Sequence, residues 1–184
     1  MAGRTSKTEF DQMSKEGVAT IAAITPNSAK LSKPDAMLMM QVAMGGMMQL
    51  ETGKVAVGEA TNSEVREMAQ AQAEEQTGLA AKLREIATAK GMTLPGTPDA
   101  KTREMVIRMQ GMSGAKLDRH YVQMHAVKGH ETLDKVMTKV KSRGQDENLM
   151  AVAKAARLLV KTHLKVACEI QTKLRGDNAM NSTR

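Results

Sequence analysis

The chain contains almost no aromatic residues. Tryptophan is absent, and among 184 residues only Phe10 and Tyr121 carry a phenyl or phenol ring. Strands of sandwiches and barrels are enriched in aromatic side chains, and proteins that bind single-stranded nucleic acid stack bases on them. The composition therefore argues against both classes. It predicts a helical protein whose core is built from Leu, Val, Ile, Ala and Met.

Cysteine and long apolar runs are also scarce. Cys168 is the only cysteine, which excludes an internal disulfide. No apolar run approaches the roughly 18 residues of a membrane-spanning helix, so we expect no transmembrane segment. The first ten residues, MAGRTSKTEF, lack the apolar stretch of a signal peptide. A cytoplasmic location is expected if this N-terminus is native, and an exported one if a targeting segment has been removed.

Charge is distributed unevenly along the chain. Residues 1–100 hold 10 basic and 12 acidic side chains, a net charge of −2, whereas residues 101–184 hold 17 and 8, a net charge of +9. A basic half can attract nucleic acid. Because no aromatic residues are interleaved with the basic ones, we interpret them as solvated helix faces. Nucleic-acid binding is therefore kept only as a second alternative function, and nucleic acid is not the expected partner.

Turn and capping signals divide the chain into four long helices and one short one. Pro34 and Asp35 open a helix that should run to about residue 60, and the later helices are expected over about 63–91, 99–111, 115–142 and 146–175. Residues 1–33 are expected to form a flexible N-terminal arm, residues 34–175 the folded domain, and residues 176–184 a disordered tail. The pattern predicts an all-α, up-down four-helix bundle with a short extra helix before the third long helix.

Methionine is abundant, and six of the 17 methionines lie between Met37 and Met48. Met37, Met40, Met44 and Met47 are separated by three, four and three positions, which places them on one helix face. We interpret this stripe as core, since methionine fills irregular gaps where aromatics are missing. A soft-metal site for Cu(I) or Ag(I) is the alternative. The adjacent Gly45 and Gly46 predict close approach of a neighbouring helix.

Each long helix also places a polar residue midway along its apolar face. These residues are Glu51, Glu75 or Gln76, His130 and His163. Side chains in a helix lean toward its N-terminus, so the polar heads of these residues lie closer in height along the bundle than their backbones do. A shared layer is therefore geometrically possible. The favoured interpretation is a structural network of paired polar groups. The alternative is a site for a divalent transition metal ion, with Glu51, Glu75, His130 and His163 as candidate ligands. The sequence establishes no cofactor.

The usual metal signatures are missing. No Glu is followed by a His three positions later, which is the paired motif of di-iron carboxylate proteins. His120, His125 and His130 are spaced five residues apart, so in a regular α-helix no two of them project together as a chelate. The sequence therefore gives no direct indication of an oxidase or other enzyme. Whether the protein is an enzyme stays open, and we favour a protein without catalytic activity.

Several segments together resemble a known family. They are AMGGMMQLETGKVA, NSEVREMAQ, AKGMTLP, SGAKLDRHYV followed by GHE, and THLKVA, which cover about residues 35–175. The chain is similar to a ferritin-like bacterial family of exported proteins of unknown function, often described as outer membrane proteins. The resemblance implies a ferritin-like bundle and a location in the periplasm or cell envelope. Members of that family tend to carry Asp-His pairs in the second and third helices and one His in the fourth.

The chain departs from that family pattern at three points. His130 and His163 match two of the histidines, but Gln76 stands where the first would be and Gly129 stands where an Asp precedes His130. The spacing from Tyr121 to His130 is also one residue longer than expected. The expected function is therefore that of a non-enzymatic, exported helical bundle of unknown role that acts by binding an unknown protein partner or by self-association. Metal binding or storage by the His/Glu layer is the alternative.

Overall fold

The computed structural model describes residues 5–181 of the chain, with side chains from residue 5 to residue 176. Every element in this part is helical and none is a strand, which confirms the all-α prediction. The elements are α1 (Lys7–Ala22), α2 (Lys33–Glu59), α3 (Ser63–Ala89), α4 (Ala100–Gln110), α5 (Gly114–Tyr121), the π-helix η1 (Val122–Val127), α6 (Lys128–Arg143) and α7 (Glu147–Asn181).

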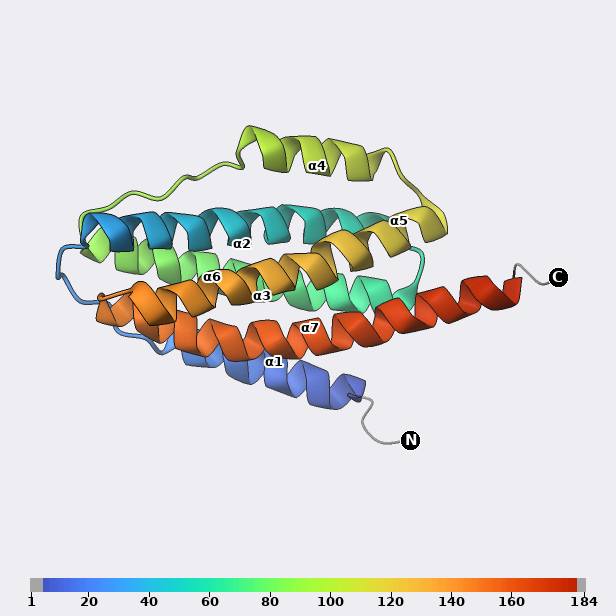
Figure 1. Cartoon of the computed structure of the whole chain (residues 1–184), viewed down its shortest axis with the longest axis horizontal. Coiled ribbons are helices and arrows are strands. Elements are labelled where there is room, and N and C mark those ends of the chain that lie inside the picture. The colour runs from blue at the N-terminus through green and yellow to red at the C-terminus, as the bar shows by residue number, and fades with distance from the viewer. Residues whose placement is uncertain (1–4, 182–184) are drawn as a thin grey trace.

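The four longest stretches of helix lie side by side (Figure 1). α2 packs against α3 and α6, and α7 packs against α6 and α3. Figure 1 shows that α3 and α6 run in the same direction, because the chain between them returns along the molecule through α4, which packs on α2. The expectation that short turns produce a simple up-down alternation is therefore wrong at this connection.

The helix starts follow the capping signals of the sequence. The Ser32 hydroxyl accepts from the backbone N–H of Asp35, and Pro34 occupies the first turn of α2. Asn62 accepts from the N–H groups of Glu64 and Val65 at the start of α3. Each such cap stabilises a helix by about 1 kcal/mol, since it satisfies backbone donors that have no partner within the helix.

The expected flexible arm, residues 1–33, contains a helix. α1 is capped by Ser6 and packs against α3 and α7, with Phe10, Ser14 and Ile21 buried. The sequence prediction missed it because the segment is mostly polar and only three of its 16 residues are buried. The expected disordered tail, residues 176–184, also begins inside a helix, since α7 continues to Asn181. Residues 1–4 and 182–184 lie outside the described part of the chain.

The buried face of α2 is shifted from the predicted methionine stripe. Met39 is fully buried, whereas Met37 is 65% exposed and Met40, Met44 and Met47 are half-buried. The buried positions of α2 include Leu38, Val42, Gly46 and Gln49. The core interpretation therefore holds for Met39 and only in part for the stripe, because the stripe lies at the edge of the buried face.

The double glycine does allow close packing, as predicted. A Cβ atom on Gly45 would lie 3.2 Å from the Leu133 side chain, and one on Gly46 would lie 2.7 Å from the Gln76 side-chain oxygen. Larger residues at Gly46 would therefore push Gln76 out of its position. This contact brings α2 against the polar part of α3.

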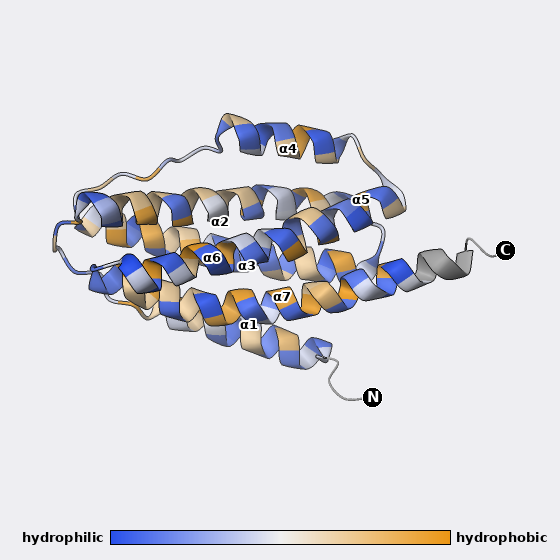
Figure 2. Ribbon diagram, in the orientation of Figure 1, coloured by the Kyte–Doolittle hydropathy of each residue, from blue (hydrophilic) through white to orange (hydrophobic). Residues whose placement is uncertain are grey.

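The hydrophobic core consists of two clusters rather than one. One cluster contains Phe10, Val65, Tyr121 and Ile170, and the other contains Ile21, Val42, Leu83 and Leu149. Figure 2 shows hydrophobic and hydrophilic residues alternating along each long helix. Between the two clusters lies a layer of buried polar side chains, which is described below.

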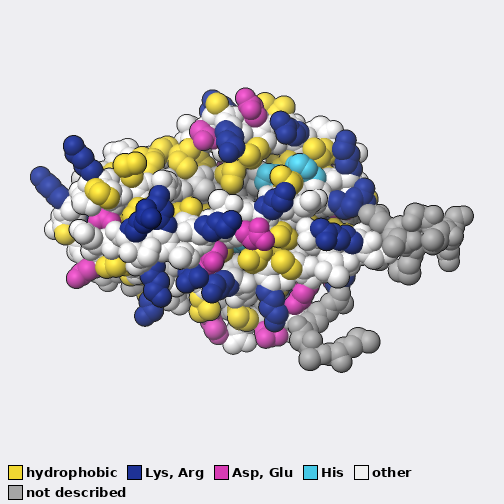
Figure 3. Space-filling view, viewed as in Figure 1, with side chains coloured by type: hydrophobic (Ala, Val, Ile, Leu, Met, Phe, Trp, Pro, Cys, Tyr) yellow, Lys and Arg dark blue, Asp and Glu magenta, His cyan; other side chains and the backbone are white. Residues whose placement is uncertain are grey.

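The outer surface is mixed in charge. Figure 3 shows Lys and Arg side chains interspersed with Asp and Glu on the visible face. No helix in the described part of the chain combines the length and apolarity that crossing a membrane requires.

Candidate metal centre

The buried polar layer takes side chains from five helices. Its members are almost wholly buried: Ser14 of α1, Gln49 of α2, Gln72, Glu75 and Gln76 of α3, His130 of α6 and His163 of α7. Along the chain, each layer residue falls between a residue of one hydrophobic cluster and a residue of the other. Burying so many polar groups is costly unless they find partners, so their contacts define what the layer can do.

Glu75 lies at the centre of this layer. Its carboxylate is 1% exposed, and its Oε1 accepts a hydrogen bond of 2.9 Å from the Gln76 side-chain amide. Its Oε2 lies 2.7 Å from Nδ1 of His163, but the two atoms do not meet the geometry of a directed hydrogen bond. Gln76 therefore orients one carboxylate oxygen and leaves the other facing the histidines.

His130 is held in a single tautomer. Its Nδ1 lies 2.5 Å from the carbonyl oxygen of Ala126, one turn earlier in the chain. A carbonyl only accepts, so Nδ1 carries the proton and Nε2 carries a lone pair. That Nε2 is buried and has no hydrogen-bond partner. A backbone carbonyl that fixes the far nitrogen of an imidazole is the usual outer support of a metal-binding histidine.

His163 is held from both sides. Ser14 of α1 places its hydroxyl oxygen 3.0 Å from His163 Nε2, and Glu75 contacts Nδ1 on the other side of the ring. The ring of Phe10 covers it with a centroid distance of 4.9 Å, and the ring of His130 lies 5.5 Å away. The helices α1, α3, α6 and α7 therefore all meet at this imidazole.

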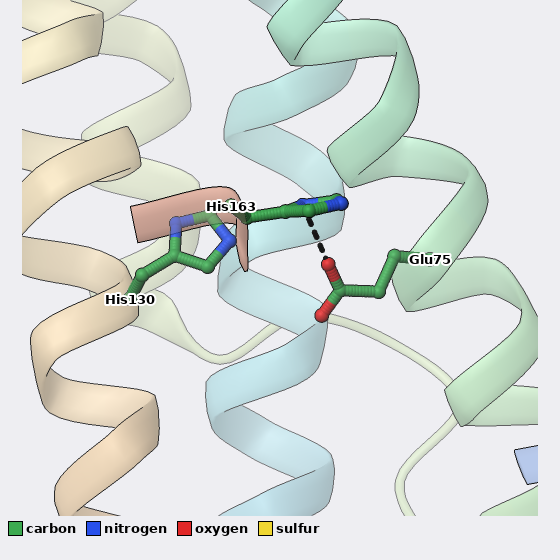
Figure 4. A group of neighbouring side chains, drawn as sticks. All are labelled: Glu75, His130 and His163. Atoms are coloured by element: carbon green, nitrogen blue, oxygen red, sulfur yellow. Dashed lines mark ion pairs between the residues drawn. The ribbon is translucent and has the colours of Figure 1, made fainter. Parts of the chain in front are cut away.

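The three ligand-type side chains converge on a common point (Figure 4). One donor atom from each of Glu75, His130 and His163 lies within 4.8 Å of the other two. Bonds of about 2.0–2.1 Å in a tetrahedral site bring donor atoms to roughly 3.3 Å from one another. Small side-chain rotations would close the observed arrangement onto one ion.

Electrostatics favour an ionised carboxylate beside a neutral imidazole. Burial raises the pKa of the Glu75 carboxyl, but the electrostatic interaction with His163, which lies 2.7 Å away, and a weaker one with His130 outweigh it, so the pKa lies below its ordinary value. Burial lowers the pKa of His130 to about 4, and the negative charge of Glu75 opposes this only in part. At neutral pH the site therefore presents a carboxylate and an unprotonated imidazole, which are the forms that bind metal.

The fourth predicted ligand lies elsewhere. Glu51 is half-exposed on α2 and pairs with Lys54 at 2.7 Å, one turn along the same helix. The inward position of α2 at this height is Gln49, two residues earlier. Glu51 and the methionine stripe were both assigned to a face of α2 that is displaced from its true buried face.

Gln49 belongs to an amide network at the edge of the layer. Gln72 donates to the backbone oxygen of Gln49 at 2.9 Å and to its side-chain oxygen at 2.7 Å, and accepts from the hydroxyl of Tyr121 at 3.0 Å. Burial raises the pKa of Tyr121, so it stays a donor. Gly129 is essential to this packing, because a Cβ atom there would lie 1.8 Å from Gln49 Nε2.

The π-helix η1 explains the extra residue between Tyr121 and His130. A π-helix accommodates one more residue than a regular α-helix over the same length, and such turns are frequent at functional sites. It keeps both Tyr121 and His130 buried, while Met124 is 40% exposed.

The same turn brings two further histidines together. His120 and His125 were predicted not to face each other, yet their rings lie 5.5 Å apart. The prediction assumed the geometry of a regular α-helix, whereas the wider π-turn places residues five apart on nearly the same side. Within the described residues, however, no third His, Cys, Asp or Glu joins this pair, unlike the set around Glu75.

The contacts of His163 also resemble the relay of a serine hydrolase. Ser14, His163 and Glu75 follow one another at 3.0 and 2.7 Å. Such enzymes additionally need fixed N–H donors to stabilise the oxyanion. Ser14 lies in the interior of α1, where the helix itself uses the backbone N–H groups. The described residues around Ser14 thus offer no preformed backbone oxyanion hole.

Comparison with known proteins identifies the family but no activity. Residues 21–170 match the family described as Domain of unknown function (DUF4142), so the chain belongs to that family. No curated protein and no solved structure matches the chain significantly. The family assignment covers α2 to α6 and most of α7, and with them Glu75, His130 and His163.

Gly129→Ala tests the packing of the layer. The new methyl group must displace the Gln49 amide, and we expect a loss of about 1–3 kcal/mol in the free energy of unfolding through overpacking and a broken buried hydrogen bond. Gly58→Ala is the matched control, since Gly58 lies in α2 and a Cβ atom added there would have nothing within 4 Å. That variant should gain up to about 1 kcal/mol from helix propensity. Equal effects in urea denaturation would contradict the packing account.

Acid should destabilise the metal-free protein through its buried neutral histidines. Burial, aided by the charge of His120, lowers the pKa of His125 to about 4 from an ordinary 6.5. The unfolded chain binds this proton more readily, so stability is present above about pH 6.5 and is lost as the pH falls toward about 4. His125→Gln should flatten the dependence by an amount on the order of 1 kcal/mol per pH unit. Urea titrations at about pH 7.5 and 5.0 with EDTA measure this, and parallel pH profiles would refute it.

Proposed function

We propose that the protein is a non-enzymatic helical bundle that binds one divalent transition metal ion through Glu75, His130 and His163. The observation that carries this proposal is the buried Nε2 of His130. Its tautomer is fixed by Ala126, and its lone pair is directed into the core without a hydrogen-bond partner. A purely structural network would leave that acceptor unsatisfied, at a cost of about 1–3 kcal/mol. A metal ion satisfies it.

The donor set defines the class of ion. Two imidazole nitrogens and one carboxylate oxygen suit Zn²⁺, Fe²⁺ and neighbouring first-row ions, whereas Mg²⁺ and Ca²⁺ prefer all-oxygen sites. His163 would bind through Nδ1 and turn its remaining N–H toward the Ser14 hydroxyl, which lies 3.0 Å from Nε2. Two further groups would orient these ligands from the side away from the ion. The Gln76 amide donates to Glu75 Oε1, and the Ala126 carbonyl accepts from Nδ1 of His130.

We extend the proposal to a ferritin-like arrangement of the four long helices. The long crossover through α4, which makes α3 and α6 parallel in Figure 1, supports it because ferritin-like folds use one such connection. A metal layer at mid-height of the helices also suits this class, in which ligands project inward from facing helices. The missing Glu-x-x-His motif argues for a single ion rather than a di-iron centre.

Metal binding should depend on the three converging side chains alone. Wild-type protein purified without chelator should bind about one equivalent of Zn²⁺ or Co²⁺ per chain and gain thermal stability in proportion to RT ln(1 + [L]/Kd). Glu75→Gln, His130→Gln and His163→Gln should each weaken binding by about 100-fold or more. Isothermal titration calorimetry and elemental analysis measure both quantities, and circular dichroism checks that each variant is folded.

Two variants serve as controls for this experiment. Glu51→Gln and His125→Gln remove ligand-type side chains that lie outside the converging set, so both should bind like the wild type. No binding by wild-type protein would refute the metal-site proposal and return the layer to a structural role. Loss of binding in either control would show that the ion sits elsewhere.

From the resemblance alone, we propose that the protein is exported and acts in the periplasm or cell envelope. Fractionation of the native bacterium with an antibody against this chain should then recover it outside the cytoplasm. Recovery with cytoplasmic markers would contradict export without bearing on the metal site.

A further inference from the structure

The candidate metal centre is sealed from solvent. Glu75 is 1% exposed, and His130 and His163 are each 0% exposed. A hydrated ion cannot reach the three ligands without movement of a covering element. The way in must therefore lie where the cover is thinnest and most weakly attached.

A groove between α1 and α3 leads toward this centre. It has a volume of about 510 Å³, and its lining includes Ser14, which contacts His163, and Glu75 itself. One oxygen of Glu75 is buried without a directed hydrogen bond. The groove is therefore bounded on its inner side by a ligand of the centre and by the hydroxyl that holds another ligand.

Acidic side chains outnumber basic ones in the lining of this groove, although the chain as a whole carries a net charge of +7. Four acidic residues line it, against two lysines, and one of these, Lys7, is paired with Glu67 at 2.8 Å. The acidic residues are Asp11, Glu67, Glu74 and Glu75. A cleft lined mainly by one sign of charge concentrates ions of the opposite sign at its mouth.

α1 is the weakest part of the wall. Its C-terminal end is held by the segment that follows, where Lys82 donates to the Ile24 carbonyl and Asn148 accepts from the Asn27 N–H. Its N-terminal half is fastened by the exposed Lys7–Glu67 pair, which is worth little, and by the buried Phe10 and Ser14. Helices with so few buried contacts open at a lower cost than the whole domain.

We propose that the groove between α1 and α3 is the access route by which a hydrated divalent cation reaches Glu75, His130 and His163. To admit the ion, α1 swings away from α3 as one helix, with the largest displacement at its N-terminal end, and the segment after Ala22 acts as the hinge. Phe10 and Ser14 close the route when they return to His163. The inference rests on the metal-binding function proposed above.

Loosening and locking α1 test this route in the full-length protein. Phe10→Ala removes the ring that covers His163, so EDTA should withdraw bound Co²⁺ about tenfold faster or more. Met109→Ala is the control, since Met109 is buried in α4, on the opposite side of the molecule from α1 (Figure 1). It should destabilise the fold without comparable acceleration.

A disulfide between α1 and α3 should slow the opening that Phe10→Ala accelerates. A Cβ on Gly78 of α3 would lie 3.0 Å from Val18 Cγ1 of α1, which keeps the two Cβ atoms within about 4.5 Å, the reach of a disulfide. Val18→Cys with Gly78→Cys, in a Cys168→Ser background, should take up Co²⁺ at least about tenfold more slowly when oxidised and recover after reduction. The final stoichiometry should be the same in both states.

The outcomes separate the two proposals. Faster release in Phe10→Ala together with slower uptake in the oxidised double-cysteine protein supports the route. Unchanged rates in both variants, with normal binding by the wild type, overturn the route and leave the metal site intact. Failure of the wild type to bind Co²⁺ at all overturns both.

Discussion

A carboxylate buried at the centre of the molecule sets the main constraint on this fold. Glu75 is 1% exposed and lies between two hydrophobic clusters, so its charge must be compensated locally. His163 faces one oxygen and Gln76 bonds the other. Because these partners come from α3 and α7, and Ser14 of α1 holds His163, the carboxylate fixes how three helices meet.

Local backbone features make room for that layer. Gly46 accommodates the oxygen of Gln76, and Gly129 accommodates the amide of Gln49. The π-helix η1 absorbs one extra residue, so that Tyr121 and His130 both stay buried on either side of it. Each feature carries a cost, since helix-interior glycines and π-turns are unfavourable on their own. Their concentration around one layer indicates that the arrangement of the layer matters more than the regularity of the helices.

The sequence predicted the helical class, and three of its four candidate ligands are side chains that the structure brings together. Glu75, His130 and His163 could be singled out because each interrupts an apolar helix face at mid-height. That pattern stays recognisable even when the assigned buried face is wrong by one residue. Glu51 was misplaced because glycines and methionines on α2 blur the boundary of its buried face, which runs through Gln49 instead. α1 and the role of Ser14 were missed because the segment is mostly polar and buries only three residues. The π-helix had one signal, the long spacing from Tyr121 to His130, but spacing alone does not say where an extra residue is accommodated.

X-ray absorption spectroscopy of the Zn²⁺-loaded protein tests the central claim most directly, because it reads the donor atoms rather than the affinity. Two imidazole nitrogens and carboxylate oxygen at about 2.0–2.1 Å from zinc are the predicted shell. The imidazole signature should weaken by half in His130→Gln if residual binding persists. A shell of oxygen donors alone would show that the ion sits on surface carboxylates, and that the Glu75 layer is a structural network.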